Sequence, residues 1–210
     1  MHIEIINKDS FCVIGKKGST DMGTGFIQKL WDDANGHFSE VANTNFNEIS
    51  NLVKRDDEEK PLACWGAMSD FSMSFMPWEN NFTRGKYLAG AECLDEALAP
   101  EGWVKWTVPG FKYIKIRCDD LDTFPNGLKY LEEHGYKLVG AVHDFTDIKT
   151  GQNYMCFPIE INQISVYQTV LHKKSQKDFS FWDLHLYDHP SLTAVFLFYG
   201  SKKGRLNRPF

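Results

Sequence analysis

The sequence predicts an α+β domain in which strands outnumber helices. Short segments of alternating apolar and polar residues recur through residues 3–161, and Gly, Pro or acidic residues separate them, as is typical of antiparallel sheets. Each half reads in the order strand–helix–strand–strand. We interpret this order as tandem βαββ repeats related by pseudo-twofold symmetry, with a central ligand cleft, although the residues of the two halves show no internal repeat.

In the first half, residues 3–16 alternate well enough to predict one long strand. Apolar residues over 26–38 then recur at helical spacing, which predicts an amphipathic helix. A short second helix is expected over residues 46–53, before an acidic loop. Residues 63–70 and 86–93 are rich in apolar and small side chains and are predicted as the remaining two strands.

The second half begins with residues 103–118, which form two strand-like runs joined by a Pro-Gly turn. A short helix is expected from Pro125, and Gly135 is the residue that ends it. Residues 138–146 and 154–161 are predicted as two further strands, joined by the turn DIKTGQ.

Two parts of the chain differ in charge. Residues 163–210 hold seven Lys and Arg against three Asp, which gives +4; subtracting this from the total of −5 leaves −9 for residues 1–162. We therefore divide the chain into a ligand-binding domain, 1–162, and a basic C-terminal extension of unknown role, 163–210. The acidic domain is a poor match for nucleic acid and is compatible with cationic ligands.

Composition favours a cytoplasmic protein. The chain is 42% hydrophobic and 24% charged, and no apolar run approaches the roughly 20 residues of a membrane helix. The first residues already read as a strand, so we expect neither a signal peptide nor a DNA-binding segment ahead of the domain. The cysteines form no C-x-x-C pair, and buried thiols are expected in preference to disulfides or a metal site: Cys12, Cys64, Cys93, Cys118 and Cys156.

The stretch from Phe82 to Ile116 suggests a binding surface. Large aromatic residues lie there among small residues and one interior carboxylate, which suits a flat, cationic organic molecule. The alternative is an ordinary sheet with aromatic residues in its core and acids in ion pairs. Trp103 and Trp106 have opposite strand parity, so only one can face a cleft, and we favour Trp106. The candidate ligand-binding residues are Trp65, Tyr87, Glu92, Trp106, Tyr113, Asp144 and Phe145.

Other kinds of site find little support in the sequence. His143 and Asp144 are neighbours on a strand and should point to opposite faces, so they do not predict a catalytic pair. No Ser or Cys nucleophile lies in a recognisable turn, and neither nucleotide-binding glycine motif is present. The histidines lack metal-ligand spacing, and we expect no metal and no cofactor.

The ordered segments VIGKKG, LW, WGAMSD, KYLAGAE, PEGWVKWTVPGFKYIKI, GYKLVGAVHDFTD and MCFPIEI resemble the GyrI-like small-molecule-binding domain, which is also the effector-binding part of some AraC-type and MerR-type regulators. The resemblance covers residues 3–161. It implies a tandem βαββ fold whose cleft binds hydrophobic, often cationic, aromatic compounds. The acidic residue of the family is usually Glu followed by an aromatic residue, and the matching positions here are Asp144 and Phe145. Glu92 is the other acid that the pattern retains.

The resemblance leaves three functions open. The first is stand-alone sequestration of toxins or drugs. The second is a hydrolase that opens the cyclopropane rings of DNA-alkylating natural products, for which Asp144 and Glu92 would be the catalytic carboxylates. The third is a protein-binding modulator of an enzyme such as gyrase. We expect a small aromatic or amphipathic ligand and no direct contact with nucleic acid or membrane; a protein partner or a homodimer is compatible with each function.

Overall fold

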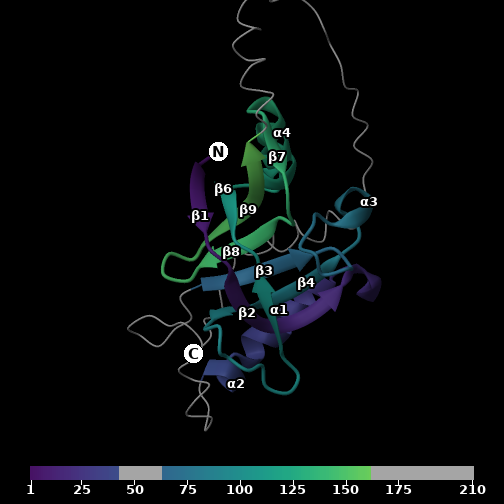
Figure 1. Ribbon diagram of the computed structural model, residues 1–210. Helices are drawn as coiled ribbons and strands as arrows, with labels where there is room; N and C mark the ends of the chain where they lie inside the picture. Colours follow the sequence, from purple (N-terminus) through teal and green to yellow (C-terminus); the bar gives the residue numbers. More distant parts are fainter. Residues whose placement is uncertain (43–62, 162–210) are drawn as a thin grey trace, which may run out of the picture.

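A single antiparallel sheet dominates the computed structural model, which describes residues 1–42 and 63–161 (Figure 1). Within these residues the sheet has nine strands in the order β1-β6-β9-β8-β3-β4-β2-β5, with β7 beside β9. The α+β class is therefore confirmed. The strands are β1 Ile3–Lys8, β2 Phe11–Ser19, β3 Ala63–Ser69, β4 Lys86–Cys93, β5 Val104–Val108, β6 Phe111–Arg117, β7 Tyr136–Leu138, β8 His143–Asp147 and β9 Gln152–Ile161.

Few helices accompany the sheet. The two long ones are α1, Phe26–His37, and α4, Thr123–Glu133. The described residues also contain two short helices, α2 (Ser39–Ala42) and α3 (Glu79–Phe82), and a 3-10 helix at Thr20–Met22. Helix α1 packs on β2 and β4, whereas α4 packs on β6, β7 and β9. Both lie on the same face of the sheet, which we call the helix face; the central strands β3 and β8 run between them.

The two halves of the chain follow the same strand order. Strands β3, β4 and β2 are adjacent in the first half, and β8, β9 and β6 in the second, so that the halves meet where β3 pairs with β8. Two strands cross over. Strand β1 precedes β2 in the chain but pairs with β6, and β5 precedes β6 but pairs with β2. Neither half is therefore a self-contained sheet.

The buried apolar side chains of the described residues gather in three clusters. One lies under α1 on the helix face and one under α4. The third lies on the other side of the sheet, which we call the opposite face, and combines Val13, Trp65 and Leu88 from the first half with Tyr113 and Cys156 from the second. On that face the junction of the two halves is therefore lined by side chains from both of them.

Two predicted strands are interrupted. Residues 3–16 form β1 and β2, which separate at Asp9 and Ser10 and pair with different strands. Residues 138–146 form β7 and β8, because the chain leaves the sheet between them: the amide of Ala141 donates to the carbonyl of Phe75 at 2.8 Å. The predicted helix at 46–53 and the extension at 163–210 lie outside the described residues.

A pair of glycines brings β2 and β4 close together. Gly15 and Gly90 lie directly opposite each other. A Cβ on Gly90 would lie 2.2 Å from the carbonyl oxygen of Ile14, and one on Gly15 would lie 2.4 Å from that of Ala89. Because these contacts are with backbone atoms, only a shift of a strand could relieve them.

We predict that Gly90→Ala destabilises the domain by about 1–3 kcal/mol, as overpacking of a close-packed interior does. The matched control is Gly36→Ala at an exposed position of α1, where an added Cβ meets nothing within 4 Å. That change should stabilise the domain by about 0.5–1 kcal/mol, because alanine favours the helix. Urea unfolding of both variants measures the difference, and equal free energies of unfolding would contradict the prediction.

Candidate functional site

The sheet separates the two predicted carboxylates. Trp65 pairs with Gly90 and Phe145, and Glu92 lies two residues from Gly90, so these side chains share the opposite face. Asp144 pairs with Gly66 on the helix face. One ligand therefore cannot contact both acids from a single side of the sheet. The opposite face carries Trp65, Glu92, Trp106, Tyr113 and Phe145, and the helix face carries Tyr87 and Asp144.

Asp144 ends a chain of hydrogen bonds that begins on α1. The indole Nε1 of Trp31 donates to the Tyr87 hydroxyl at 3.0 Å, and that hydroxyl donates to Oδ2 of Asp144 at 2.8 Å. All three side chains are buried. This series of hydrogen bonds connects α1, β4 and β8. Its carboxylate lies on a central strand, between the two long helices.

Gly66 makes this arrangement sterically feasible. Tyr87 lies on β4 and Asp144 on β8, so the phenol must cross the intervening strand β3 to reach the carboxylate. It crosses at Gly66, where a Cβ would lie 1.9 Å from the Tyr87 hydroxyl. The glycine of WGAMSD was predicted to lie within a strand, but its role depends on a tyrosine far along the chain.

Burial and charge fix the protonation of Tyr87. Burial, and then the charge of Asp144, raise the pKa of Tyr87 well above its usual range, so the phenol stays a neutral donor. Asp144 also contributes to the raised pKa of Cys118, for which burial is the main cause.

Glu92 on the opposite face has a cation from its own chain. Its carboxylate accepts from Nε1 of Trp65 at 3.1 Å and from Nζ of Lys8 at 3.1 and 3.2 Å. The same ammonium lies 4.3 Å from the ring centroid of Phe11 and 5.3 Å from that of Trp65. Sequence reasoning missed Lys8, because no local pattern connects residue 8 with residue 92.

A row of aromatic rings, one from each of the strands β2, β3, β8 and β9, extends from this ion pair. The ring centroids of Phe11 and Trp65 are 4.6 Å apart, those of Trp65 and Phe145 4.8 Å, and those of Phe145 and Tyr154 5.8 Å. Lys115 lies over the far end, with its Nζ 3.9 Å from the Tyr154 centroid. The row connects two of the predicted ligand-binding aromatic residues.

Trp106 and Tyr113 are core residues on the same face. Trp106 packs edge-on against Phe75, which reaches it from the loop after β3, and Tyr113 packs against Phe111. Trp103 lies in the cluster under α1, so the two tryptophans take opposite sides of the sheet, as their spacing predicts.

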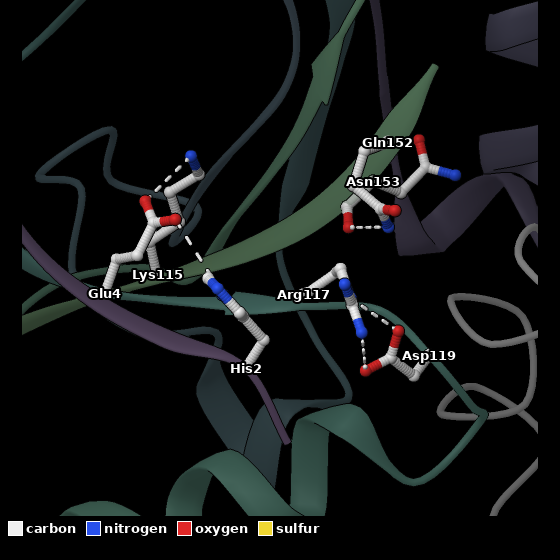
Figure 2. Close-up of polar contacts among 7 residues, drawn as sticks. All are labelled: His2, Glu4, Lys115, Arg117, Asp119, Gln152 and Asn153. Carbon is white, nitrogen blue, oxygen red and sulfur yellow. Dashed lines mark hydrogen bonds and ion pairs between the residues drawn. The ribbon is translucent and has the colours of Figure 1, made fainter. Parts of the chain in front are cut away.

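The sheet edge formed by β1 and β6 carries polar side chains (Figure 2). Glu4 contacts His2 at 3.8 Å and Lys115 at 3.3 Å, and Arg117 pairs with Asp119 through two contacts of 2.7 and 3.2 Å. Most of these side chains are well exposed, and exposed ion pairs contribute little to stability. We assign no site to this edge.

His143 is a structural histidine. It is fully buried, and its Nδ1 accepts the amide of Met68 at 3.0 Å, which places the proton on Nε2. Burial lowers the pKa of His143 to about 3, so the ring is neutral near pH 7. It lies on the opposite face and Asp144 on the helix face, so the two cannot act as a pair.

Among the described residues no group of three or more His, Cys, Asp or Glu side chains could hold a metal ion. The same residues contain no helix long and apolar enough to cross a membrane. None of the five cysteines is in a disulfide, and four of them are buried.

Neither the protein-family models nor the curated proteins yield a match to the sequence. Solved structures do match. The C-terminal domain of EcmrR is 12% identical with a TM-score of 0.51, over 77% of this chain and 98% of that one. SAV2435 bound to tetraphenylphosphonium is 10% identical with a TM-score of 0.50, over 80% and 99%. These likenesses confirm the GyrI-like fold expected from the sequence; at such identities they establish the fold alone.

We predict that burial of His143 makes the domain sensitive to acid. Its pKa rises to about 6.5 on unfolding, so the unfolded chain binds the extra proton and stability falls as the pH drops below that value. Between about pH 7 and pH 5 the native protein should lose about 2 kcal/mol more than His143→Gln, whose amide oxygen can still accept the Met68 amide. Urea unfolding at both pH values checks this, and parallel losses would contradict it.

Proposed function

We propose that this domain binds hydrophobic, cationic aromatic molecules at Asp144 on the helix face and thereby sequesters toxins or drugs. One observation carries the proposal: a buried carboxylate lies on the central strand β8, held at 2.8 Å by a neutral tyrosine. The shared fold supports it, because one structure with that fold, SAV2435, holds the cation tetraphenylphosphonium.

The chemistry of the site explains why a cation would be preferred. Asp144 accepts a hydrogen bond from the Tyr87 hydroxyl, and its carboxylate can pair with the positive charge of a ligand. A delocalised organic cation loses little hydration on burial, and its rings can pack on aromatic side chains such as Trp31. In Asp144→Asn the side-chain amide keeps the shape of the carboxylate but carries no charge, so this variant isolates the contribution of the charge.

We also interpret the two strand series as tandem βαββ repeats related by a pseudo-twofold axis, with the ligand bound beside the boundary between them. The matching orders β3-β4-β2 and β8-β9-β6 support this interpretation. Asp144 belongs to β8, the strand that pairs with β3 at that boundary.

We predict that Asp144→Asn weakens the binding of tetraphenylphosphonium by at least about tenfold, equivalent to about 1.4 kcal/mol. Tyr87→Phe should weaken it less, because the charge remains. Glu92→Gln on the opposite face is the matched control. It should leave the affinity within about twofold of wild type, whatever it does to the stability of the domain. Isothermal titration measures the three affinities, and quenching of tryptophan fluorescence gives a second readout. Equal weakening by Glu92→Gln would overturn the choice of Asp144.

Triphenylphosphine oxide, a neutral molecule with similar rings, tests the role of ligand charge. It should bind wild type and Asp144→Asn with the same affinity. Tighter binding of the neutral compound by wild type than by Asp144→Asn would contradict a charge-based site.

A hydrolase that opens cyclopropane rings is the second hypothesis, favoured by a proton-donating phenol beside the carboxylate. Asp144 and Glu92 lie on opposite faces, so a mechanism that needs both acids is not available, and Asp144 would act with Tyr87. Catalytic turnover of a cyclopropane-bearing alkylator, lost in Asp144→Asn, would support this function. Protection limited to one equivalent would support sequestration. Modulation of an enzyme such as gyrase stays a prediction, to be tested by co-purification.

A further inference from the structure

The Lys8 ammonium occupies a set of groups that would suit an organic cation. A carboxylate, Glu92, lies 3.1 Å from Nζ, and the rings of Phe11 and Trp65 lie 4.3 and 5.3 Å from it. Aromatic faces and a carboxylate are the groups that recognise quaternary ammonium ligands in proteins. Trp65 also donates its indole Nε1 to Glu92 at 3.1 Å, which fixes both the ring and the carboxylate.

Lys8 reaches this position from a strand that pairs elsewhere in the sheet. It ends β1, whose partner is β6, whereas Glu92 belongs to β4 and Trp65 to β3. The ammonium is thus a tethered occupant and not part of the scaffold that forms the site. Its side chain is 24% exposed and that of Glu92 is 10% exposed, so solvent reaches the ion pair from the side of Lys8.

A second lysine on the same face provides a comparison. Lys115 lies 3.9 Å from the centroid of Tyr154, 5.3 Å from that of Phe145, and 3.3 Å from Glu4. The Glu4 side chain, however, is 41% exposed and remains hydrated when its partner is removed. Of these two carboxylates, Glu92 is the one that is both buried and beside aromatic rings.

We propose that Glu92, Trp65 and Phe11 form a second cation-binding site, on the opposite face, whose resident cation is the Lys8 ammonium and which admits small organic ammonium ions when Lys8 is displaced or neutralised. Tethering gives Lys8 a high effective concentration, so a free cation competes poorly with it in the native chain. The site is independent of ligand binding at Asp144, because the sheet lies between them.

The test compares wild type with Lys8→Met, which removes the ammonium and keeps a long apolar side chain. The probe is tetramethylammonium chloride, with sodium chloride at equal concentration as the ionic-strength control. The indole N–H signal of Trp65, assigned with Trp65→Phe, is followed by NMR. We expect the Trp65 signal of Lys8→Met to shift saturably, with an affinity for tetramethylammonium at least about tenfold tighter than that of wild type. We expect no shift in Lys8→Met/Glu92→Gln.

The matched control is Lys115→Met, which removes the other ammonium over aromatic rings. It should leave the response of the Trp65 signal to tetramethylammonium as weak as in wild type, and create no comparable site at Glu4. A gain in Lys115→Met as large as in Lys8→Met would overturn the proposal, because it would show that any deleted lysine exposes such a site.

Thermal unfolding provides a second measurement in case Lys8→Met folds poorly. Tetramethylammonium, compared with sodium, should raise the unfolding midpoint of Lys8→Met and leave those of wild type and the double variant unchanged. Lys8→Gln, whose amide can still donate to Glu92, allows the same comparison in a less disruptive variant. Absence of both the NMR shift and the stabilisation in these variants would overturn the proposal.

Discussion

The pairing of β3 with β8 is the constraint on which both proposed binding sites depend. It sets Gly66 opposite Asp144 on the helix face and Trp65 opposite Phe145 on the other. Because side chains alternate along a strand, a slip of one residue would exchange the two sets. The register thus lets Tyr87 cross β3 at a glycine to reach Asp144, and it aligns Trp65 between Phe145 and Phe11.

The two faces stabilise a buried carboxylate in different ways. On the helix face Asp144 accepts a hydrogen bond from Tyr87. On the opposite face Glu92 is paired with the Lys8 ammonium and also accepts from Trp65. The Lys8 ammonium competes with any cation that approaches Glu92, and we therefore propose Asp144 as the primary ligand site.

Local patterns predicted most of the elements and little of the site. The segments that became β4 and α1 were predicted closely, because alternation and helical spacing are properties of neighbouring residues. The division of residues 3–16 into two strands was not, because it depends on partners about a hundred residues away. Strand parity separated Trp103 from Trp106, but it could not relate Glu92 to Asp144, since the orientation of one strand against another is set by pairing. Lys8 carried no signal of its own.

The crossing of β1 and β5 has a consequence for how the chain reaches its native state. Among the described residues the strand partner of β1 is β6, whose residues 111–117 are made long after residues 3–8. During synthesis the first strand must wait, unpaired, until more than half of the domain has left the ribosome. Non-local pairing of this kind slows folding and leaves apolar edges such as Ile3 and Ile5 open to aggregation in the meantime. The domain is therefore expected to mature late and as a whole, and chaperones that shield nascent strands should raise its yield.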